Sequence, residues 1–272
     1  MTTDRQYRDL DFDPSAIRHE YGANVHIERD PLALTQLARL CAPEMEQPTF
    51  NRTLVRLYRR LLQTVVNAEF PRTEARIPSR MQESTDRGVY HGEIIDPETS
   101  VVTVDIARGG IVPSNTCFEE LTSLLEPEQV RQDHLFMSRT TNEAGEVTGA
   151  EINGDKVGGS VEEEIVLLPD PMGATGSSMS GAIDYYKDSV AGTPDEIVAM
   201  NLIITPEYLV RLRDEHPETK VYALRLDRGM SPAEVLETIP GERWAEESGL
   251  DEHDYIVPGG GGFGELMNNS WD

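Results

Sequence analysis

Residues 165–178 read IVLLPDPMGATGSS, a buried strand followed by a tight loop of small residues and the start of a helix. The apolar run predicts a strand over Glu164–Leu168, and the helix is expected to begin near Ser177. Such a loop turns several backbone N–H groups toward one point, and the helix start adds partial positive charge there. The stretch therefore favours a phosphate-binding loop. The alternative is an ordinary strand-to-helix turn, in which glycine and serine only ease the geometry.

Polar side chains in the same stretch point to a sugar phosphate. Thr175, Ser177 and Ser178 supply hydroxyl donors. Asp170 follows the strand directly, at the carboxyl end where open α/β sheets bind their ligands. A carboxylate beside a phosphate site suits sugar hydroxyls or a metal-bound sugar phosphate.

Strands and helices alternate on both sides of this stretch. Apolar runs predict strands at Val101–Ile106, His134–Met137, Glu164–Leu168, Ile197–Ile204, Val221–Leu226 and Tyr255–Val257. Helical spacing and caps predict helices from Asp30–Pro31 to Pro43, from Thr49 onward, near Asn115–Leu125, from Thr205 to Glu215, and a short one with a capping box at Ser231–Glu234. Alternation of fully apolar strands with helices predicts an α/β fold, a doubly wound and mainly parallel sheet with N-terminal helices.

Three segments lack this regular pattern. Residues 138–163 are polar and glycine-rich without an apolar period, so they predict a long loop that is able to close over a site and exclude water. Residues 1–24 are interpreted as an N-terminal extension of a domain spanning 25–272. A stretch near 229–249 is interpreted as an insertion in that domain, in which Trp244 either packs or helps to build an interface.

The charge composition indicates adaptation to salt. The formal net charge is -25, and only three of the 24 basic residues are lysines, at Lys156, Lys187 and Lys220. A surface rich in carboxylates and poor in lysine keeps a protein hydrated in concentrated salt, where self-repulsion is screened. We therefore expect a halophilic protein. The same charge argues against a nucleic-acid partner, which needs clustered Lys and Arg.

Other features of the composition favour the cytoplasm. No apolar run approaches the roughly 20 residues that span a bilayer, so no membrane partner is expected. The N-terminal MTTDRQYRDLDFDPSA is polar and acidic, unlike a secretory signal. Cys41 and Cys117 are too few for a disulfide framework and fit buried thiols in a reducing compartment.

Three strand ends are expected to meet in one crevice of a doubly wound sheet, namely Ala107–Gly110, Asp170–Ser178 and Ile256–Gly264. Arg108, between small residues, is suited to grip a phosphate with its planar guanidinium; a surface arginine in a turn is the alternative. The glycine run lets the backbone approach a ligand, and a wall of N–H and C=O groups suits the edge of a flat heterocycle. A flexible C-terminal tail is the other interpretation of that run.

Taken together, these motifs resemble a known family. DPMGATGSS at 170–178, ARGG at 107–110 and LDEHDYIVPGGGGFGE at 250–265 are similar to uracil phosphoribosyltransferases, as a divergent member. The resemblance runs from about residue 30 to the C-terminus and implies the type I phosphoribosyltransferase fold with a small C-terminal hood that binds the base. It implies transfer of phosphoribosyl from phosphoribosyl pyrophosphate (PRPP) to uracil, giving UMP and pyrophosphate with Mg²⁺ assisting. Family members are usually dimers or higher, so a homo-oligomer is expected.

The resemblance also implies roles for individual residues. Asp170 would contact the ribose hydroxyls, and Arg108 and Arg139 would hold pyrophosphate; these three are the expected catalytic residues. The PRPP-binding residues would be Arg108, Arg139, Asp170, Pro171, Met172, Gly173, Ala174, Thr175, Gly176, Ser177, Ser178 and Gly262. The uracil-binding residues would be Ile256, Gly261, Gly262 and Phe263. The metal ligands are not assigned.

One position departs from the family pattern. The family normally carries an aspartate, which binds PRPP or its metal, where this chain has Gly262, and Glu265 follows three residues later. Two alternatives to the enzyme therefore stay open. One is a regulatory protein that binds PRPP or a nucleotide with little or no turnover, and the other is a phosphoribosyltransferase for another base.

Overall fold

The computed structural model describes residues 4–141 and 147–271. Its main sheet has eight strands, ordered β1-β10-β9-β7-β4-β5-β6 with β8 beside β9. The described neighbours run parallel, except that β5 and β6 are antiparallel. The strands are β1 (Val25–Ile27), β4 (Val101–Ala107), β5 (Val130–Thr141), β6 (Val147–Lys156), β7 (Ile165–Pro169), β8 (Met172–Gly173), β9 (Glu196–Ile204) and β10 (Lys220–Leu226). The predicted doubly wound, mainly parallel sheet is confirmed.

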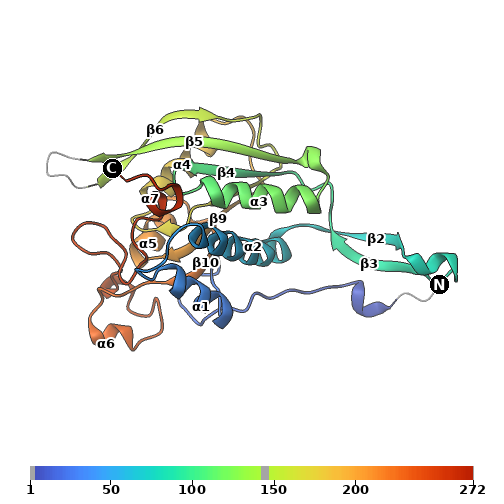
Figure 1. Cartoon of the computed structure of the whole chain (residues 1–272), viewed down its shortest axis with the longest axis horizontal. Helices are drawn as coiled ribbons and strands as arrows, with labels where there is room; N and C mark the ends of the chain where they lie inside the picture. Colours follow the sequence, from blue (N-terminus) through green and yellow to red (C-terminus); the bar gives the residue numbers. More distant parts are fainter. Residues whose placement is uncertain (1–3, 142–146, 272) are drawn as a thin grey trace.

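Helices cover both faces of this sheet (Figure 1). Side chains of α1, α2 and α3 share one hydrophobic core, and side chains of α4 and α5 share the other. Val101 points into the first core and Val102 into the second, as the alternation of side chains along a strand requires. The helices are α1 (Pro31–Leu40), α2 (Thr49–Glu69), α3 (Ile111–Leu124), α4 (Ser177–Asp188), α5 (Pro206–Glu215), α6 (Ala233–Leu236) and α7 (Phe263–Asn268). Burial on both faces explains why these strands are apolar throughout.

Two predicted helix caps are confirmed and two are wrong. The Asp30 carboxylate accepts hydrogen bonds from two N–H groups of the first turn of α1, and the Thr205 hydroxyl caps α5 in the same way. Thr49 does not cap α2: it is the first helical residue, and Pro48 holds the cap position without a side-chain bond. The Ser231 hydroxyl does not cap α6 but accepts a hydrogen bond from the N–H of Ser248.

The predicted loop over residues 138–163 is wrong. β5 continues to Thr141 and pairs with β6 as an antiparallel hairpin, while residues 142–146 lie outside the described part of the chain. β6 is an edge strand in which Glu151, Asn153 and Asp155 are exposed to water, and no apolar alternation marks it in the sequence. The predicted strand at Tyr255–Val257 is also wrong, since there only Ile256 pairs, in an isolated bridge with Leu250. The helix expected from Asn115 begins at Ile111.

A second sheet was not predicted. Strands β2 (Arg72–Pro78) and β3 (Val89–Ile95) form an antiparallel pair that extends away from the main sheet (Figure 1). The N-terminal segment lies along it, with the rings of Tyr7 and Tyr90 at 6.3 Å. Short 3₁₀ helices complete the fold at Arg5–Tyr7, Arg80–Glu83, Pro127–Gln129 and Trp244–Glu246.

The two segments interpreted as additions contact each other. The hydroxyl of Tyr21 donates to the carboxylate of Glu247, and the Tyr21 ring meets Trp244 edge-on at 4.9 Å. Glu247 also pairs with Arg228 at 2.7 Å, and the Glu247 side chain is fully buried. Trp244 therefore packs within the fold. The proposed boundaries at residues 24 and 229–249 stay predictions.

The strand order places a topological switch point between β4 and β7. From β4 the chain moves outward to β5 and β6, whereas from β7 it moves the opposite way to β9 and β10. Open α/β sheets bind ligands in the crevice at such a point, beyond the carboxyl ends of the strands. Within residues 4–141 and 147–271, none of the helices has the length and apolarity of a membrane span.

Candidate active site

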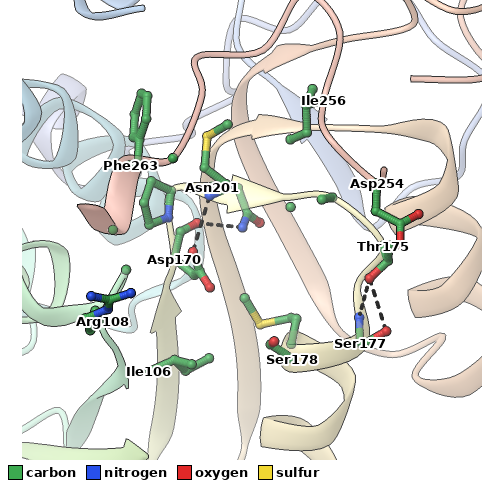
Figure 2. Close-up of a pocket in the computed structure, with 18 of the residues that line it drawn as sticks. Ile106, Arg108, Asp170, Thr175, Ser177, Ser178, Asn201, Asp254, Ile256 and Phe263 are labelled. Atoms are coloured by element: carbon green, nitrogen blue, oxygen red, sulfur yellow. Dashed lines mark hydrogen bonds between the residues drawn. The ribbon is translucent and has the colours of Figure 1, made fainter. Parts of the chain in front are cut away.

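A cavity of about 600 Å³ lies at this switch point (Figure 2). It is lined by the end of β4, by residues of β5 and β9, by the loop that follows β7, by the start of α4, and by the loop that precedes α7. The predicted site residues in its lining are Arg108, Asp170, Pro171, Met172, Gly173, Ala174, Thr175, Gly176, Ser177, Ser178, Ile256, Gly261, Gly262 and Phe263. The three strand ends that the sequence singles out therefore meet in one crevice.

The loop before α4 holds its carbonyl groups away from the cavity. The carbonyl of Gly173 accepts from the N–H of Thr205 at 3.1 Å, and that of Ala174 accepts from the Thr205 hydroxyl at 2.7 Å. The carbonyl of Thr175 accepts from Nε of Arg211 at 2.9 Å. Because these carbonyls accept hydrogen bonds on the side of the loop away from the cavity, the peptide dipoles of the loop direct their N–H ends toward the cavity.

Several N–H groups of this loop are available to an anion. In the described part of the chain, no hydrogen-bond acceptor is paired with the N–H of Thr175, Gly176 or Ser178. The N–H of Ala174, which we expected to take part, is instead bonded to the carbonyl of Met172 at 3.1 Å. Gly176 holds the N-cap of α4 at φ 80°, a left-handed conformation that glycine adopts without strain. The loop and the helix start thus form an anion site.

Hydroxyl groups extend the same site. The side chains of Thr175 and Ser177 are hydrogen-bonded at 3.1 Å, and Ser178 lies on the next position of the helix (Figure 2). Because a hydroxyl both donates and accepts, this pair keeps a proton available for a ligand oxygen. The N–H groups and hydroxyls together match the oxygens of one phosphate group.

Asp170 is fixed at the end of β7. Its N–H donates to the carbonyl of Met200 at 3.1 Å, and its own carbonyl accepts from the side-chain amide of Asn201 at 2.7 Å. The amide oxygen of Asn201 accepts in turn from the hydroxyl of Tyr208 at 2.9 Å. Burial raises the pKa of Tyr208 well above its ordinary value, and the charge of Asp170 adds to this, so the phenol stays a donor.

The loop after β4 brings Arg108 to the opposite wall of the cavity. A side chain at Gly109 would stand 3.3 Å from the Asp170 carboxylate, and one at Gly110 would overlap the backbone N of Ile106 at 2.5 Å. Position 110 therefore requires glycine, and glycine at position 109 lets the turn pack closely against Asp170. The guanidinium of Arg108 lies 3.5 Å from the Glu265 carboxylate and donates to the hydroxyl of Ser270 at 3.1 Å.

Ile256 lines the third side of the cavity. In its bridge with Leu250, the hydrogen bonds are made by the flanking residues, from Asp251 N–H to the Tyr255 carbonyl and from Val257 N–H to the carbonyl of residue 249. In such a pair the N–H and C=O of Ile256 point away from Leu250. Among described residues neither group has a hydrogen-bond partner. An adjacent donor and acceptor are thus offered to a ligand.

The comparisons with known proteins identify the family. A family model described as uracil phosphoribosyltransferase matches residues 27–241. The chain belongs to the uracil phosphoribosyltransferase family. The match ends before the loop that carries Ile256.

Individual relatives are distant. A uracil phosphoribosyltransferase from Caldanaerobacter subterraneus subsp. tengcongensis is 33% identical over 112 residues, 41% of this chain and 42% of that protein. One from Polaromonas naphthalenivorans is 25% identical over 245 residues, 90% of this chain and 98% of that protein. The solved structure of the AQ2163 protein from Aquifex aeolicus covers 90% of this chain and 97% of its own with a TM-score of 0.67 at 18% identity, which shows a shared fold. The alignment with the first of these relatives spans less than half of its length.

Two predicted site residues need comment. Arg139 lies in β5, where its backbone pairs with Ala150, but its side chain lies outside the described part of the structure. Phe263 lines the cavity, but its ring is only 2% exposed and packs edge-on against Phe50 at 5.1 Å. Phe263 therefore supports the wall of the cavity mainly from within the core.

Sequence reasoning missed several residues of the lining. They come from strands, from α5 and from part of the 250–265 stretch to which no role was assigned: Ile106, Met137, Ser138, Asn201, Tyr208, Asp254 and Tyr255. Asn201 interrupts the apolar run of β9, and a fully buried amide in a central strand is the signal that could have found it. Asp254 adopts φ 62°, uncommon for a residue other than glycine, and it lines the same cavity as Thr175.

Proposed function

We propose that this chain transfers the phosphoribosyl group of PRPP to uracil, giving UMP and pyrophosphate in pyrimidine salvage. The observation that carries the proposal is the anion site before α4, whose carbonyls are bound from behind by Thr205 and Arg211. The names of the relatives support the choice of uracil.

The cavity offers a group for each part of the two substrates. The loop from Gly173 to Ser178 is suited to the 5′-phosphate, and the Asp170 carboxylate to the ribose hydroxyls. The guanidinium of Arg108 is suited to pyrophosphate, on which negative charge grows as it leaves. The paired donor and acceptor of Ile256 match an edge of uracil that carries an N–H beside a carbonyl.

The reaction exchanges one bond for another at C1 of the ribose. The bond from C1 to a pyrophosphate oxygen breaks, the bond from C1 to N1 of uracil forms, and N1 loses its proton. The protein's contribution is to hold base and sugar in line and to stabilise charge on the leaving group.

Mg²⁺ fits the site as an ion held together with the substrate. The carboxylates in the cavity lining are those of Asp170, Asp254 and Glu265, and the described residues contain no group of three side chains placed to hold a metal ion. Mg²⁺ usually binds through one or two carboxylates plus substrate phosphates. We propose Asp170 or Glu265 as the carboxylate; the bound ion would neutralise charge on the pyrophosphate.

The test is an assay of UMP formation from uracil and PRPP with Mg²⁺ in molar salt. Product that depends on both substrates supports the proposal. Pyrophosphate release with another base, in a panel of pyrimidines and purines, would change the substrate. Tight binding of PRPP or UMP without product would instead support the regulatory protein. We also propose that the protein is cytoplasmic and forms a homodimer or larger homo-oligomer. Light scattering after gel filtration tests the oligomeric state.

A further inference from the structure

We infer that Arg225 and Asp227 form a clamp that positions the base-binding backbone and so determines affinity for the base; the inference rests on the proposed function. Neither residue lines the cavity. Both lie where β10 ends, and no motif of the sequence pointed to them. They act through Gly259, which lies in the loop between Ile256 and Gly261.

The two side chains form a rigid pair. Arg225 donates from Nε to one carboxylate oxygen of Asp227 at 2.6 Å and from Nη2 to the other at 2.7 Å. This two-point geometry fixes both planes relative to each other. The Asp227 side chain is 2% exposed, and the Arg225 side chain 20%. A buried, doubly bonded pair is a stiff support for a neighbouring loop.

The pair forms hydrogen bonds with both the N–H and the carbonyl of Gly259. The N–H of Gly259 donates to Oδ2 of Asp227 at 2.8 Å, and its carbonyl accepts from Nη2 of Arg225 at 3.0 Å. Gly259 has φ 58°, so its peptide groups point in directions that other residues rarely adopt. The peptide planes on both sides of Gly259 are therefore held by one ion pair.

Gly259 in turn touches the backbone that faces the base. A side chain at Gly259 would overlap the carbonyl oxygen of Ile256, so Gly259 packs directly against that carbonyl. The Ile256 carbonyl is the acceptor that the proposed function assigns to the base. A shift of Gly259 would move this acceptor relative to the donor groups around the cavity, and misplacement by about 1 Å is costly in an active site.

The phosphate half of the cavity has a different support. The loop from Gly173 to Thr175 is held by Thr205 and Arg211, which make no hydrogen bond to Gly259. Breaking the Arg225–Asp227 pair should therefore weaken binding of the base and leave binding of the sugar phosphate unchanged. A general loss of stability would instead weaken both.

The test uses the full chain with Arg225→Lys, which keeps the charge but loses the planar fork. We expect KM for uracil to rise about tenfold, with KM for PRPP and kcat within about twofold of wild type. Asp227→Asn, which keeps the shape of the side chain, is a second variant. It should likewise raise KM for uracil and leave KM for PRPP and kcat nearly unchanged. Thermal melting checks that each variant is folded.

Arg131→Lys is the matched control. Arg131 donates to the carboxylate of Asp133, also two residues later in the sequence, at 3.0 Å, and to the carbonyl of Ser160 at 3.2 Å. Like Arg225, it therefore makes an ion pair with a nearby aspartate and a hydrogen bond to the backbone of a loop. It lies at the start of β5 and does not line the cavity. Equal rises in both KM values for Arg225→Lys, or the same split for Arg131→Lys, would overturn the inference.

A binding measurement separates this inference from the proposed function. Calorimetric titration with UMP and with ribose 5-phosphate compares ligands that share the sugar phosphate and differ in the base. Clamp variants should bind UMP about tenfold more weakly than wild type and ribose 5-phosphate equally well. If wild type makes no UMP while this split is observed, the function fails and the clamp stands. If wild type makes UMP and both clamp variants match it in KM and binding, the clamp fails alone.

Discussion

The carboxylate of Glu265 occupies the space that a side chain at Gly262 would fill. Gly262 has φ -78°, so its backbone suits any residue, and only the Glu265 side chain limits what can stand there. Where the family resemblance leads us to expect an aspartate at position 262, a carboxylate that reaches back from the first turn of α7 lies in its space. Glu265 also lies 3.5 Å from Arg108, beside the proposed pyrophosphate site.

This replacement predicts a rescue. Glu265→Ala, which also clears the space beside Gly262, should weaken Mg²⁺-dependent binding of PRPP by about tenfold, because a hard oxygen ligand is lost near the pyrophosphate. Adding Gly262→Asp to that variant should recover most of the affinity. Titration with PRPP at several Mg²⁺ concentrations is the measurement. An equal loss in both variants would show that a carboxylate at position 262 cannot replace Glu265, and unchanged affinity in the single variant would show that Glu265 has no role.

Arg108 should be essential for the leaving group. We expect Arg108→Ala to lower kcat/KM by about a hundredfold or more, and Arg108→Lys to recover only part, since a single ammonium cannot make two parallel bonds. Asp170→Asn should also lower kcat/KM, through the ribose. Steady-state kinetics with both substrates varied is the check. Arg59→Ala, which breaks a surface pair with Glu120, is the control and should leave kcat/KM unchanged. Normal activity in both site variants would refute the site assignment.

The left-handed glycine at the N-cap of α4 gives a third prediction. Gly176→Ala should weaken binding of ribose 5-phosphate about tenfold or more, because the new Cβ strains φ 80° and meets Arg211 at 3.1 Å, which moves the N–H groups of the loop. Gly22→Ala is the matched control: its φ of 111° is also positive, and no atom lies within 4 Å of the added Cβ. Both variants should lose stability, but only Gly176→Ala should lose affinity. Equal affinities would show that the loop does not bind phosphate.

Local sequence was sufficient to predict elements that are buried on both faces. Ile197–Ile204 and Val101–Ile106 are strands because both of their faces pack against helices, and such runs stay apolar throughout. The anion loop was predictable because its chemistry lies within a few consecutive residues. The orientation of the loop's carbonyls was not predictable, because Thr205 and Arg211, which hold them away from the cavity, are distant in sequence.

The missed features depend on tertiary contacts or on exposed edges. The hairpin of β5 and β6 looks like a loop in the sequence, because an edge strand needs no apolar alternation. Asp227 carries no local sign that it binds Gly259, since 32 residues separate them. The position of Glu265 over Gly262 depends on where α7 begins, which a run of glycines does not specify.

One buried and two half-buried histidines should make the fold sensitive to acid. Burial lowers the pKa of His19, His26 and His216 below the ordinary value of 6.5. The unfolded chain then takes up protons at a higher pH than the folded chain does. The stability that these groups contribute is present above pH 6.5 and is lost as the pH falls below it.

Melting temperatures between pH 8 and pH 5.5 in molar salt test this, with His26→Phe as the variant. Phenylalanine keeps the stacking on Tyr222, whose ring lies 4.5 Å away, but does not titrate. The variant should lose less stability than wild type on acidification, and His253→Gln, at an exposed side chain, should behave as wild type. Burial raises the pKa of Glu28 and Asp105, and this makes the folded state more stable, relative to the unfolded state, as the pH falls. The effect is the same in wild type and in His26→Phe, so it cancels when their melting temperatures are compared. Identical pH profiles for wild type and His26→Phe would contradict the prediction.

Stability should depend strongly on salt. The net charge of -25, which already counts all 24 basic residues, creates repulsion that added ions screen. Lys187 pairs with Glu218, and Lys220 bridges Glu69 and Glu196. We expect the melting temperature to rise by about 10 °C or more between 0.1 M and 3 M KCl, which corresponds to several kcal/mol for a chain of this size.

Two comparisons show whether charge is the cause. Replacing the exposed Glu44, Glu46 and Glu237 by lysine should flatten the salt dependence, because each replacement removes repulsion without touching the core. Replacing the same residues by aspartate keeps the charge and should leave the dependence unchanged. Sucrose stabilises proteins by exclusion from their surface rather than by screening, so it should raise the melting temperatures of both variants alike. A wild-type melting temperature that is equal in low and molar salt would exclude the salt adaptation that the composition indicates.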